Sequence, residues 1–157
     1  MSRVQHANEP DIQDIVALNN RYATQGLTLM RSEEFVYAHL ADYRVLRDGD
    51  GGIVGCAALD EYSPSVVELI SLAVSQDEQG VGHGKALIEA TEQLARKRGY
   101  DELFSVSFSD ELFLACGFSR SALSNYPEKI ARYERIDRSE LQVGEKHCFT
   151  KRLREKA

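Results

Sequence analysis

A glycine-rich stretch in the middle of the chain has the residues of an anion-binding loop. Gly80, Gly82 and Gly84 alternate with Val81 and His83, after an apolar run and before a segment of helical periodicity. Glycines permit a tight turn in which successive backbone N–H groups point into one concavity, and the N-terminus of a following helix adds partial positive charge. The pattern predicts a site for phosphate oxygens, with a tight connection of no function as the alternative.

The residues around this loop exclude two common phosphate ligands. The stretch lacks the Gly-Lys-Ser/Thr ending with which a P-loop holds a nucleoside triphosphate. A dinucleotide-binding fingerprint follows the first strand of its domain, whereas this loop comes after three or four predicted strands. The loop therefore indicates another phosphate-bearing ligand.

The elements that must position the loop follow from hydrophobic periodicity and helix-start signals. The segment 8–11 is typical of a helix start, Ser32 has the position of a helix cap, and the charged segment 127–137 is expected to be helical. Two further helices are expected at Lys85–Arg98 and Asp110–Cys116. Strands are expected at Val4–Ala7, Tyr43–Arg47, Ile53–Leu59, Val66–Val74, Leu103–Ser107 and, as a last edge strand, Cys148–Leu153. This order predicts an α/β (α+β) fold, a mixed twisted sheet with helices on both faces.

Length and charge narrow the class of protein further. The 157 residues suit one domain, and 25 acidic against 19 basic side chains give a net charge of −6, which argues against a nucleic-acid binder. Residues 120–157 hold ten Lys and Arg against six Asp and Glu, a net +4 beside −10 for the rest. That basic segment is either a solvated face or serves an anionic ligand.

Cysteine and histidine spacing, and the length of the apolar runs, add three expectations. The cysteines Cys56, Cys116 and Cys148 show no paired or metal-ligand spacing, and neither do the four histidines, so no metal is expected. No apolar run approaches the roughly 18–20 residues that cross a bilayer. A reducing cytoplasm without membrane attachment is the expected location.

The loop and its flanks together resemble the GNAT superfamily of N-acetyltransferases. The stretch Gln79–Gly84 fits that family's Gln/Arg-x-x-Gly-x-Gly/Ala signature. Leu72-Ala73-Val74 resembles the family's pantetheine-binding strand, and Gly117-Phe118 its late Gly-Phe pair. The resemblance implies the GNAT acyl-CoA N-acyltransferase fold, with residues 1–157 as a single domain.

Acetyl-CoA is the co-substrate that this resemblance implies. Gln79 is expected at the mouth of the loop, and Leu72, Ala73 and Val74 are expected to run beside the pantetheine as if it were another strand. A backbone N–H near Ala73 or Val74 is expected to meet the thioester oxygen. The pyrophosphate is expected at the backbone N–H groups of Gly80, Val81, Gly82, His83, Gly84 and Lys85.

Shorter strings resemble the acetyltransferase domain of bacterial N-acetylglutamate synthases over roughly residues 3–140. They include residues 25–34, Gly55–Leu59 and the sequence Tyr-Pro-Glu-Lys at 126–129. The resemblance implies acetyl transfer to the α-amine of an amino acid, in that family glutamate, at the start of arginine synthesis. This chain lacks the arginine that precedes the family's serine, here Ser109, so both glutamate and glutamine stay open as acceptors. The synthases also carry an amino-acid-kinase-like domain, so we expect a stand-alone short form or one domain of a larger protein.

Glu68 is the candidate for accepting the proton of the acceptor amine. It is the sole charge in the run Val66–Ile70, which is also the pattern of a solvent-facing residue on an alternating strand. The resemblance favours a general base beside the thioester. For the leaving thiolate, Phe113 stands where many family members have a tyrosine, so Ser107 or Ser109 is left to donate through water. Cys116 lies among apolar neighbours and is not expected to act as a nucleophile.

Arg31 is the candidate for holding the acceptor's carboxylate, because a guanidinium can form a paired, two-bond contact with it. The alternative is a surface arginine near a helix cap. Ser109 is expected to contact the substrate as well, and Lys129, Arg132 and Arg135 either contribute or are solvated.

Three hypotheses follow for the function, each with a small-molecule ligand. The first is an amino-acid N-acetyltransferase, and the second keeps the fold but acts on another amine, such as a protein N-terminus, lysine, polyamine or drug. The third is a module that binds acetyl-CoA and senses it without turnover. A homodimer through an edge strand is compatible with each of them.

Overall fold

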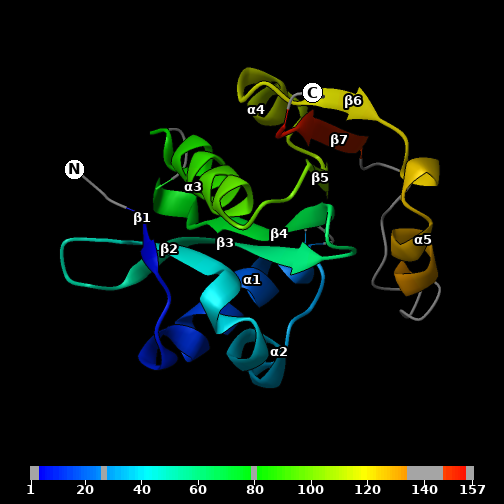
Figure 1. The fold of residues 1–157 in the computed structure, drawn as a ribbon. Coiled ribbons are helices and arrows are strands. Elements are labelled where there is room, and N and C mark those ends of the chain that lie inside the picture. Colours follow the sequence, from blue (N-terminus) through cyan, green and yellow to red (C-terminus); the bar gives the residue numbers. More distant parts are fainter. Residues whose placement is uncertain (1–3, 26–27, 79–80, 134–146, 155–157) are drawn as a thin grey trace.

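A mixed sheet forms the centre of the fold (Figure 1). The computed structural model describes residues 4–25, 28–78, 81–133 and 147–154. Within them the strand order is β1-β2-β3-β4-β5-β7-β6, in which β4 and β5 run parallel and the other neighbours antiparallel. The strands are β1 Val4–His6, β2 Tyr43–Arg47, β3 Ile53–Glu61, β4 Val66–Val74, β5 Glu102–Ser107, β6 Ser119–Ser121 and β7 His147–Arg152.

Helices cover both faces of the sheet, as the sequence predicts (Figure 1). Helices α1 and α2 lie on one face and α3 lies on the other, whereas α5 stands to one side. The helices are α1 Ile12–Ala23, α2 Glu33–Ala38, α3 His83–Lys97, α4 Asp110–Ala115 and α5 Pro127–Tyr133. Short 3₁₀ turns occupy Glu9–Asp11, Leu40–Asp42, Gln76–Glu78 and Leu123–Asn125.

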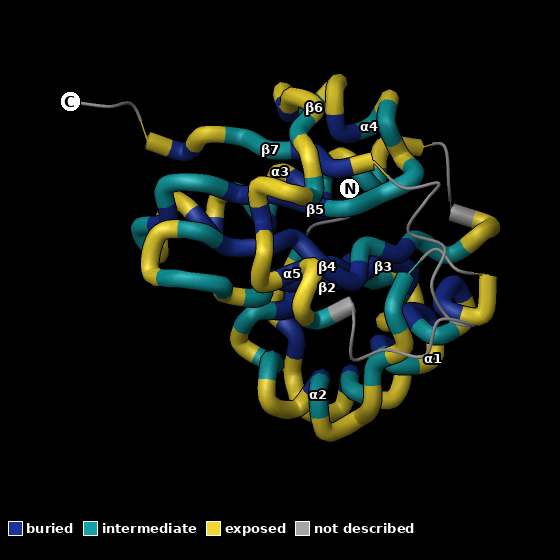
Figure 2. Tube along the Cα trace, turned by 90° about the vertical axis from the view of Figure 1, so that its right-hand side faces the viewer, coloured by how far each residue is buried: buried dark blue, intermediate teal, exposed yellow. Residues whose placement is uncertain are grey.

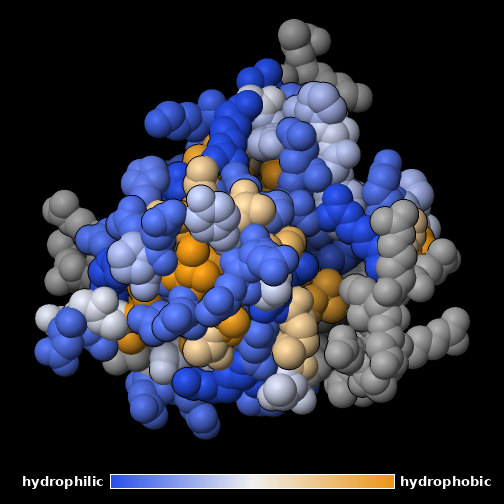
Figure 3. All heavy atoms as spheres, turned by 90° about the horizontal axis from the view of Figure 1, so that it is seen from below, coloured by the Kyte–Doolittle hydropathy of each residue, from blue (hydrophilic) through white to orange (hydrophobic). Residues whose placement is uncertain are grey.

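Successive side chains of the central strands supply two apolar cores, one on each face, because they alternate in direction. Leu46 packs with Leu87 of α3, whereas its neighbour Val45 packs with Ile15 of α1 and Val36 of α2. The buried run along the central strands and the exposed outer faces of the helices are visible in Figure 2. Seen from the α1 and α2 side, the surface is mostly hydrophilic, with apolar side chains showing between polar ones (Figure 3).

Most predicted elements are confirmed, and the last strand differs. The predicted cap Ser32 accepts the backbone N–H of Phe35 at 3.0 Å. The expectation of an edge strand at Cys148–Leu153 is wrong, because β7 pairs with β5 on one side and β6 on the other. Strand β6 is not predicted from the sequence, because three residues are too few to show apolar alternation. Of the predicted helix at 127–137, residues 134–137 lie outside the described residues.

Strand β4 carries an irregularity that matters for the site. Cys56 and Ala58 of β3 are two residues apart in the sequence. Their pairing partners on β4, Ala73 and Ile70, are three residues apart. The extra residue is accommodated around Ser71, whose φ of 58° lies in the left-handed region. Such a bulge reverses the side-chain alternation, so Ile70 and Ala73 both join the core beside α1.

Strands β4 and β5 separate after a short parallel contact. Their register ends at Glu68 opposite Phe104, although β4 continues to Val74 and β5 to Ser107. Beyond that point the hydroxyl of Ser105 donates to the carbonyl of Leu69 at 2.9 Å. The second half of β4 therefore has a ladder partner, β3, along one edge only within the described chain.

Candidate active site

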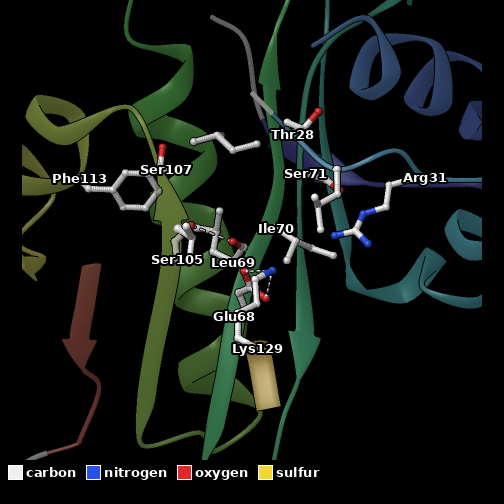
Figure 4. A pocket seen from close by; sticks show the side chains of 13 residues that line it. Thr28, Arg31, Glu68, Leu69, Ile70, Ser71, Ser105, Ser107, Phe113 and Lys129 are labelled. Carbon is white, nitrogen blue, oxygen red and sulfur yellow. Dashed lines mark hydrogen bonds and ion pairs between the residues drawn. The ribbon is translucent and has the colours of Figure 1, made fainter. Parts of the chain in front are cut away.

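A pocket lies where β4 and β5 separate (Figure 4). Side chains reach it from these two strands, from the segment between α1 and α2, and from α4 and α5. The two predicted site residues Arg31 and Glu68, far apart in the sequence, both line it. The thirteen lining residues are Thr28, Leu29, Arg31, Glu68, Leu69, Ile70, Ser71, Leu72, Ser105, Val106, Ser107, Phe113 and Lys129.

Glu68 is a buried carboxylate, not a solvent-facing strand residue. Its exposed fraction is 3%. The ammonium of Lys129 lies 2.9 Å from Oε2 and 3.1 Å from Oε1, and the hydroxyl of Tyr62 donates to Oε1 at 2.8 Å. Burial and the neighbouring Glu68 carboxylate raise the pKa of Tyr62, so its hydroxyl stays protonated and donates.

Of the three basic residues left open at 129–135, the described two both make ion pairs. Lys129 is 4% exposed and reaches Glu68 from α5. Arg132 pairs with Asp60 of β3 at 2.5 Å and lies over the ring of Tyr62 at 3.9 Å. Arg135 lies outside the described residues. One cation of the basic segment, Lys129, thus lines the pocket.

Arg31 lies partly buried opposite Glu68 in the pocket (Figure 4). The side chain of Asn20 fixes its backbone, with Nδ2 donating to the Arg31 carbonyl at 2.8 Å and Oδ1 accepting its N–H at 2.9 Å. Its guanidinium lies 4.4 Å from the centre of the Phe35 ring. Its Nε is buried without a hydrogen-bond partner among the described residues, so the side chain keeps a donor for a ligand.

The two serines of β5 line the pocket, whereas Ser109 after the strand does not. Ser105 and Ser107 line the pocket, and the Ser107 hydroxyl accepts the N–H of Ser109 at 3.0 Å. Ser109 itself is exposed at the start of α4 and is not among the lining residues. Phe113, at the position expected to exclude a tyrosine donor, is fully buried and stacks on Phe149 with 5.3 Å between ring centres.

Of the residues expected to bind the cofactor, Leu72 lines this pocket. Ala73 and Val74 follow on the part of β4 beyond the contact with β5, and the Val74 carbonyl accepts a hydrogen bond from the Tyr22 hydroxyl. Helix α3 begins at His83 after Gly82, whose φ of 90° requires the left-handed region that glycine tolerates. Gln79 and Gly80 lie outside the described residues.

Gly84 differs from Gly82 in its surroundings. A Cβ there would lie 2.9 Å from Cδ2 of Leu112 on α4, whereas a Cβ at Gly82 meets nothing within 4 Å. Gly84 thus permits close packing of α3 on α4, and Gly82 permits the turn into the helix. Val81 and Lys85 flank these positions, Val81 with 67% of its surface exposed.

None of the three cysteine thiols is suited to act as a nucleophile. Burial raises the pKa of Cys56 to about 12, and burial with the nearby Glu68 raises that of Cys148 to about 12. The pKa of Cys116 is also raised, mainly by burial. A thiolate is therefore disfavoured at each position, as the apolar surroundings of Cys116 predict. Within the described residues no three His, Cys, Asp or Glu gather as a metal site, and no helix there has the length and apolar character of a membrane span.

Two residues of the site could not be predicted from the sequence alone. Tyr62, which contacts Glu68, lies in a polar turn between β3 and β4 where nothing marks a functional residue. Ser71 lines the pocket in a strained backbone conformation, with its hydroxyl 3.0 Å from that of Tyr43. Polar residues inside an otherwise apolar strand, as at Glu68 and Ser71, are the one signal that the sequence offers.

Sequence comparisons identify the family to which this fold belongs. Residues 12–118 match the Acetyltransferase (GNAT) family, and the chain belongs to this family. An uncharacterised N-acetyltransferase of Chlorobaculum tepidum is 30% identical, over 82% of this chain and 83% of that protein. An amino-acid acetyltransferase of Neisseria meningitidis is 33% identical, over 80% of this chain and 29% of that protein.

Solved structures extend the likeness to the synthases that the short sequence strings resemble. N-acetylglutamate synthase of Neisseria gonorrhoeae, complexed with coenzyme A and N-acetyl-glutamate, matches with a TM-score of 0.84 and 29% identity. The match covers 99% of this chain and 36% of the synthase, so the chain spans about a third of that relative. A putative acetyltransferase of Salmonella typhimurium, solved with acetyl-CoA, shares the fold with a TM-score of 0.75 at 18% identity. The predicted fold and family are confirmed, and relatives hold the predicted cofactor.

Proposed function

We propose that this GNAT acetyltransferase transfers the acetyl group of acetyl-CoA to the α-amine of a small amino acid, with glutamate and glutamine as the favoured acceptors. The observation that carries the proposal is one pocket that holds Arg31, with a donor to spare, opposite the buried carboxylate of Glu68. An α-amino acid presents a carboxylate and an amine on one carbon, which matches a cation facing a proton acceptor.

Acetyl-CoA, when bound, supplies an acetyl group activated as a thioester. Residues 70–73 of β4 fit an extended amide chain, because their edge has no ladder pairing with β5 among the described residues. Leu72 links this edge to the acceptor pocket, so the acetyl end would lie next to the acceptor. The residues Gly82, His83, Gly84 and Lys85 begin α3, where N–H groups and the helix dipole favour phosphate.

In this proposal Arg31 binds the acceptor's α-carboxylate and so orients its amine. The Asn20 contacts fix the backbone from which the guanidinium extends, which limits the freedom lost on binding. Among the charged residues that line the pocket, Arg31 and Lys129 outnumber Glu68 by one positive charge, which favours an anionic acceptor over a polyamine.

Glu68 takes the amine proton, directly or through a water, before the amine attacks the thioester carbon. The thioester oxygen then meets a backbone N–H near Ala73 or Val74. Ser107 lines the pocket and is better placed than Ser109 to donate toward the departing thiolate. For Ser109, a substrate contact remains a proposal that rests on the sequence resemblance.

The experiment that tests the proposal measures CoA release from acetyl-CoA with L-glutamate, L-glutamine, other amino acids, an N-terminal peptide and spermidine. We expect turnover with amino acids and little with the peptide or polyamine. Turnover confined to the peptide or polyamine would contradict the proposal, and tight acetyl-CoA binding without release would support a sensing module.

A companion variant tests the role of Glu68. Replacing the carboxylate by the amide of Glu68→Gln removes the proton acceptor and preserves size, so kcat should fall by roughly 10²–10⁴. Ser65→Ala, in the turn before β4, is an exposed control that should leave kcat unchanged. A loss below twofold across the pH range would exclude a general base at this position.

The proposal treats residues 1–157 as one acetyltransferase domain. It also includes the arginine-biosynthetic role that the sequence resemblance implies, the cytoplasmic location expected from the cysteine spacing and the short apolar runs, and the compatibility with a homodimer through an edge strand.

A further inference from the structure

We propose that Lys129 is a positioning residue which, together with Tyr62, holds the Glu68 carboxylate so that Oε2 is the oxygen that accepts the proton from the acceptor amine. This inference rests on the proposed function, in which Glu68 is the base. Lys129 lies on a separate helix, α5, and takes no part itself in the proposed reaction steps.

The hydrogen bonds of Glu68 distinguish its two oxygens. Oε1 accepts from the Tyr62 hydroxyl at 2.8 Å and from the Lys129 ammonium at 3.1 Å. Oε2 accepts from Lys129 at 2.9 Å. A carboxylate oxygen has about two acceptor directions. Among the described residues Oε1 is therefore fully used, whereas Oε2 keeps one direction for an amine or a water.

Lys129 is one of two cations of α5 that pair with carboxylates of the sheet. Asp60 of β3 and Glu68 of β4 stand directly opposite each other in the sheet, an arrangement of like charges that destabilises a strand pair. Lys129 pairs with Glu68 and Arg132 pairs with Asp60. The two cations are three residues apart and so lie on one face of α5. The helix thus neutralises both carboxylates of the strand pair.

Tyr62 couples the two ion pairs. Its hydroxyl donates to Glu68, and its ring lies under the guanidinium of Arg132, with 3.9 Å between the guanidinium carbon and the ring centre. Tyr126, just before α5, stacks on Phe104 with 3.8 Å between ring centres, which fixes the start of the helix beside β5. The orientation of the Glu68 carboxylate therefore depends on the docking of α5.

A purely structural attachment of α5 would not need a buried ammonium. The Lys129 side chain is 5% exposed, and burying a charge is costly unless it is paired. An apolar side chain would avoid that cost. What the ammonium adds is a partner that contacts both oxygens of the Glu68 carboxylate and so fixes its orientation.

The charged and titratable groups around Glu68 come from every neighbouring element. They are Lys129 and Arg132 of α5, Asp60 of β3, Tyr62 after β3, Arg31 of the opposite wall and Cys148 of β7. The pKa of Tyr62 is raised by burial and by Glu68, and that of Cys148 is raised to about 12, so both stay protonated in the working range. Removing Lys129 takes away the cation in direct contact with Glu68.

The test compares Lys129→Met and Lys129→Arg with the wild type and with Ile130→Met, an exposed neighbour on the same helix. The measurements are kcat, KM for acetyl-CoA and KM for the amino acid. Lys129→Met should lower kcat by about 10- to 100-fold through misplacement of the base, with an unchanged KM for acetyl-CoA. Lys129→Arg, which keeps a cation at this place, should restore part of kcat, and Ile130→Met should match the wild type.

A kcat in Lys129→Met within twofold of the wild type would overturn the inference, and so would a loss that lies in KM for acetyl-CoA and is not rescued by Lys129→Arg. If Lys129→Met does not fold, Tyr62→Phe serves instead, with a smaller loss of kcat and an unchanged KM for acetyl-CoA. Glu68→Gln separates the two proposals: wild-type activity in Glu68→Gln contradicts the base itself, whereas an inactive Glu68→Gln beside an unaffected Lys129→Met contradicts the positioning role alone.

Discussion

Helix α5 lines the candidate active site and α3 begins at the proposed cofactor turn, and the two helices are held to the sheet in opposite ways. Helix α3 buries Leu87, Ile88, Leu94 and Ala95 in the core between helix and sheet. Helix α5 is a two-turn element whose buried contact with the sheet is the ammonium of Lys129. The two are separated in Figure 1, with α3 over the sheet and α5 to one side.

The difference separates a scaffold helix from a helix with a proposed role in the chemistry. Apolar packing is non-directional and strong, so α3 holds the turn at its N-terminus, the proposed cofactor site, in place. An ion pair fixes direction and charge but adds little net stability when buried, because desolvation offsets the attraction. Loss of an apolar core contact of α3 should therefore appear mainly in the free energy of unfolding, whereas loss of the partly exposed Arg132 ion pair of α5 should appear mainly in the kinetics.

The largest expected effect on stability is at Leu87. Its side chain is fully buried between α3 and the sheet, so Leu87→Ala should lower the free energy of unfolding by about 2–5 kcal/mol. Ile130→Ala on α5, at a side chain 36% exposed, should change it by about 0.5 kcal/mol or less. Urea unfolding measures both. Equal losses would contradict the contrast between the two helices.

A smaller effect is expected at the turn that begins α3. Gly82→Ala forces an alanine into the left-handed region, which costs about 1–2 kcal/mol, although its Cβ meets no neighbour. Because this strain falls on the proposed phosphate site, the affinity for acetyl-CoA measured by calorimetry should fall as well. Gly49→Ala, in the hairpin turn, is the matched control, with open space around its Cβ and no left-handed φ. Unchanged affinity in Gly82→Ala would remove the turn from the cofactor site.

The smallest effect on stability is expected at Arg132. Arg132→Gln breaks a partly exposed ion pair with Asp60, so the free energy of unfolding should fall by about 1 kcal/mol or less. Its kcat/KM should nevertheless fall, by less than in Lys129→Met, because Tyr62 loses its cation. Arg154→Gln removes an exposed ion pair with Asp101 at the far end of β7 and should leave kcat/KM unchanged. A loss in stability without a kinetic change would restrict Arg132 to fastening α5.

The sequence predicts the fold almost completely, because apolar periodicity and helix-start signals are local. Strand β4 and the cap at Ser32 lie where the pattern puts them. The order of the last strands could not be predicted, since β6 and β7 are specified by pairing between segments about thirty residues apart.

The site divides in the same way. Arg31 and Glu68 could be proposed from residue type and from resemblance, and the structure brings them into one pocket. The partners of Glu68 could not, because Tyr62 and Lys129 meet it only through the antiparallel pairing of β3 with β4 and the docking of α5. Among the serines, the choice of Ser107 over Ser109 for the pocket also depends on the path of the chain after β5.

The most direct test of the account is whether the acceptor's α-carboxylate is recognised at Arg31. Steady-state kcat/KM would be measured for L-glutamate and L-glutamine, each beside its α-amide, with the wild type and with Arg31→Lys. The account predicts that the wild type strongly prefers the free α-carboxylate, and that Arg31→Lys loses most of this preference through a higher KM for the amino acid. Equal kcat/KM for acid and α-amide in the wild type, or an unchanged KM in Arg31→Lys, would contradict it.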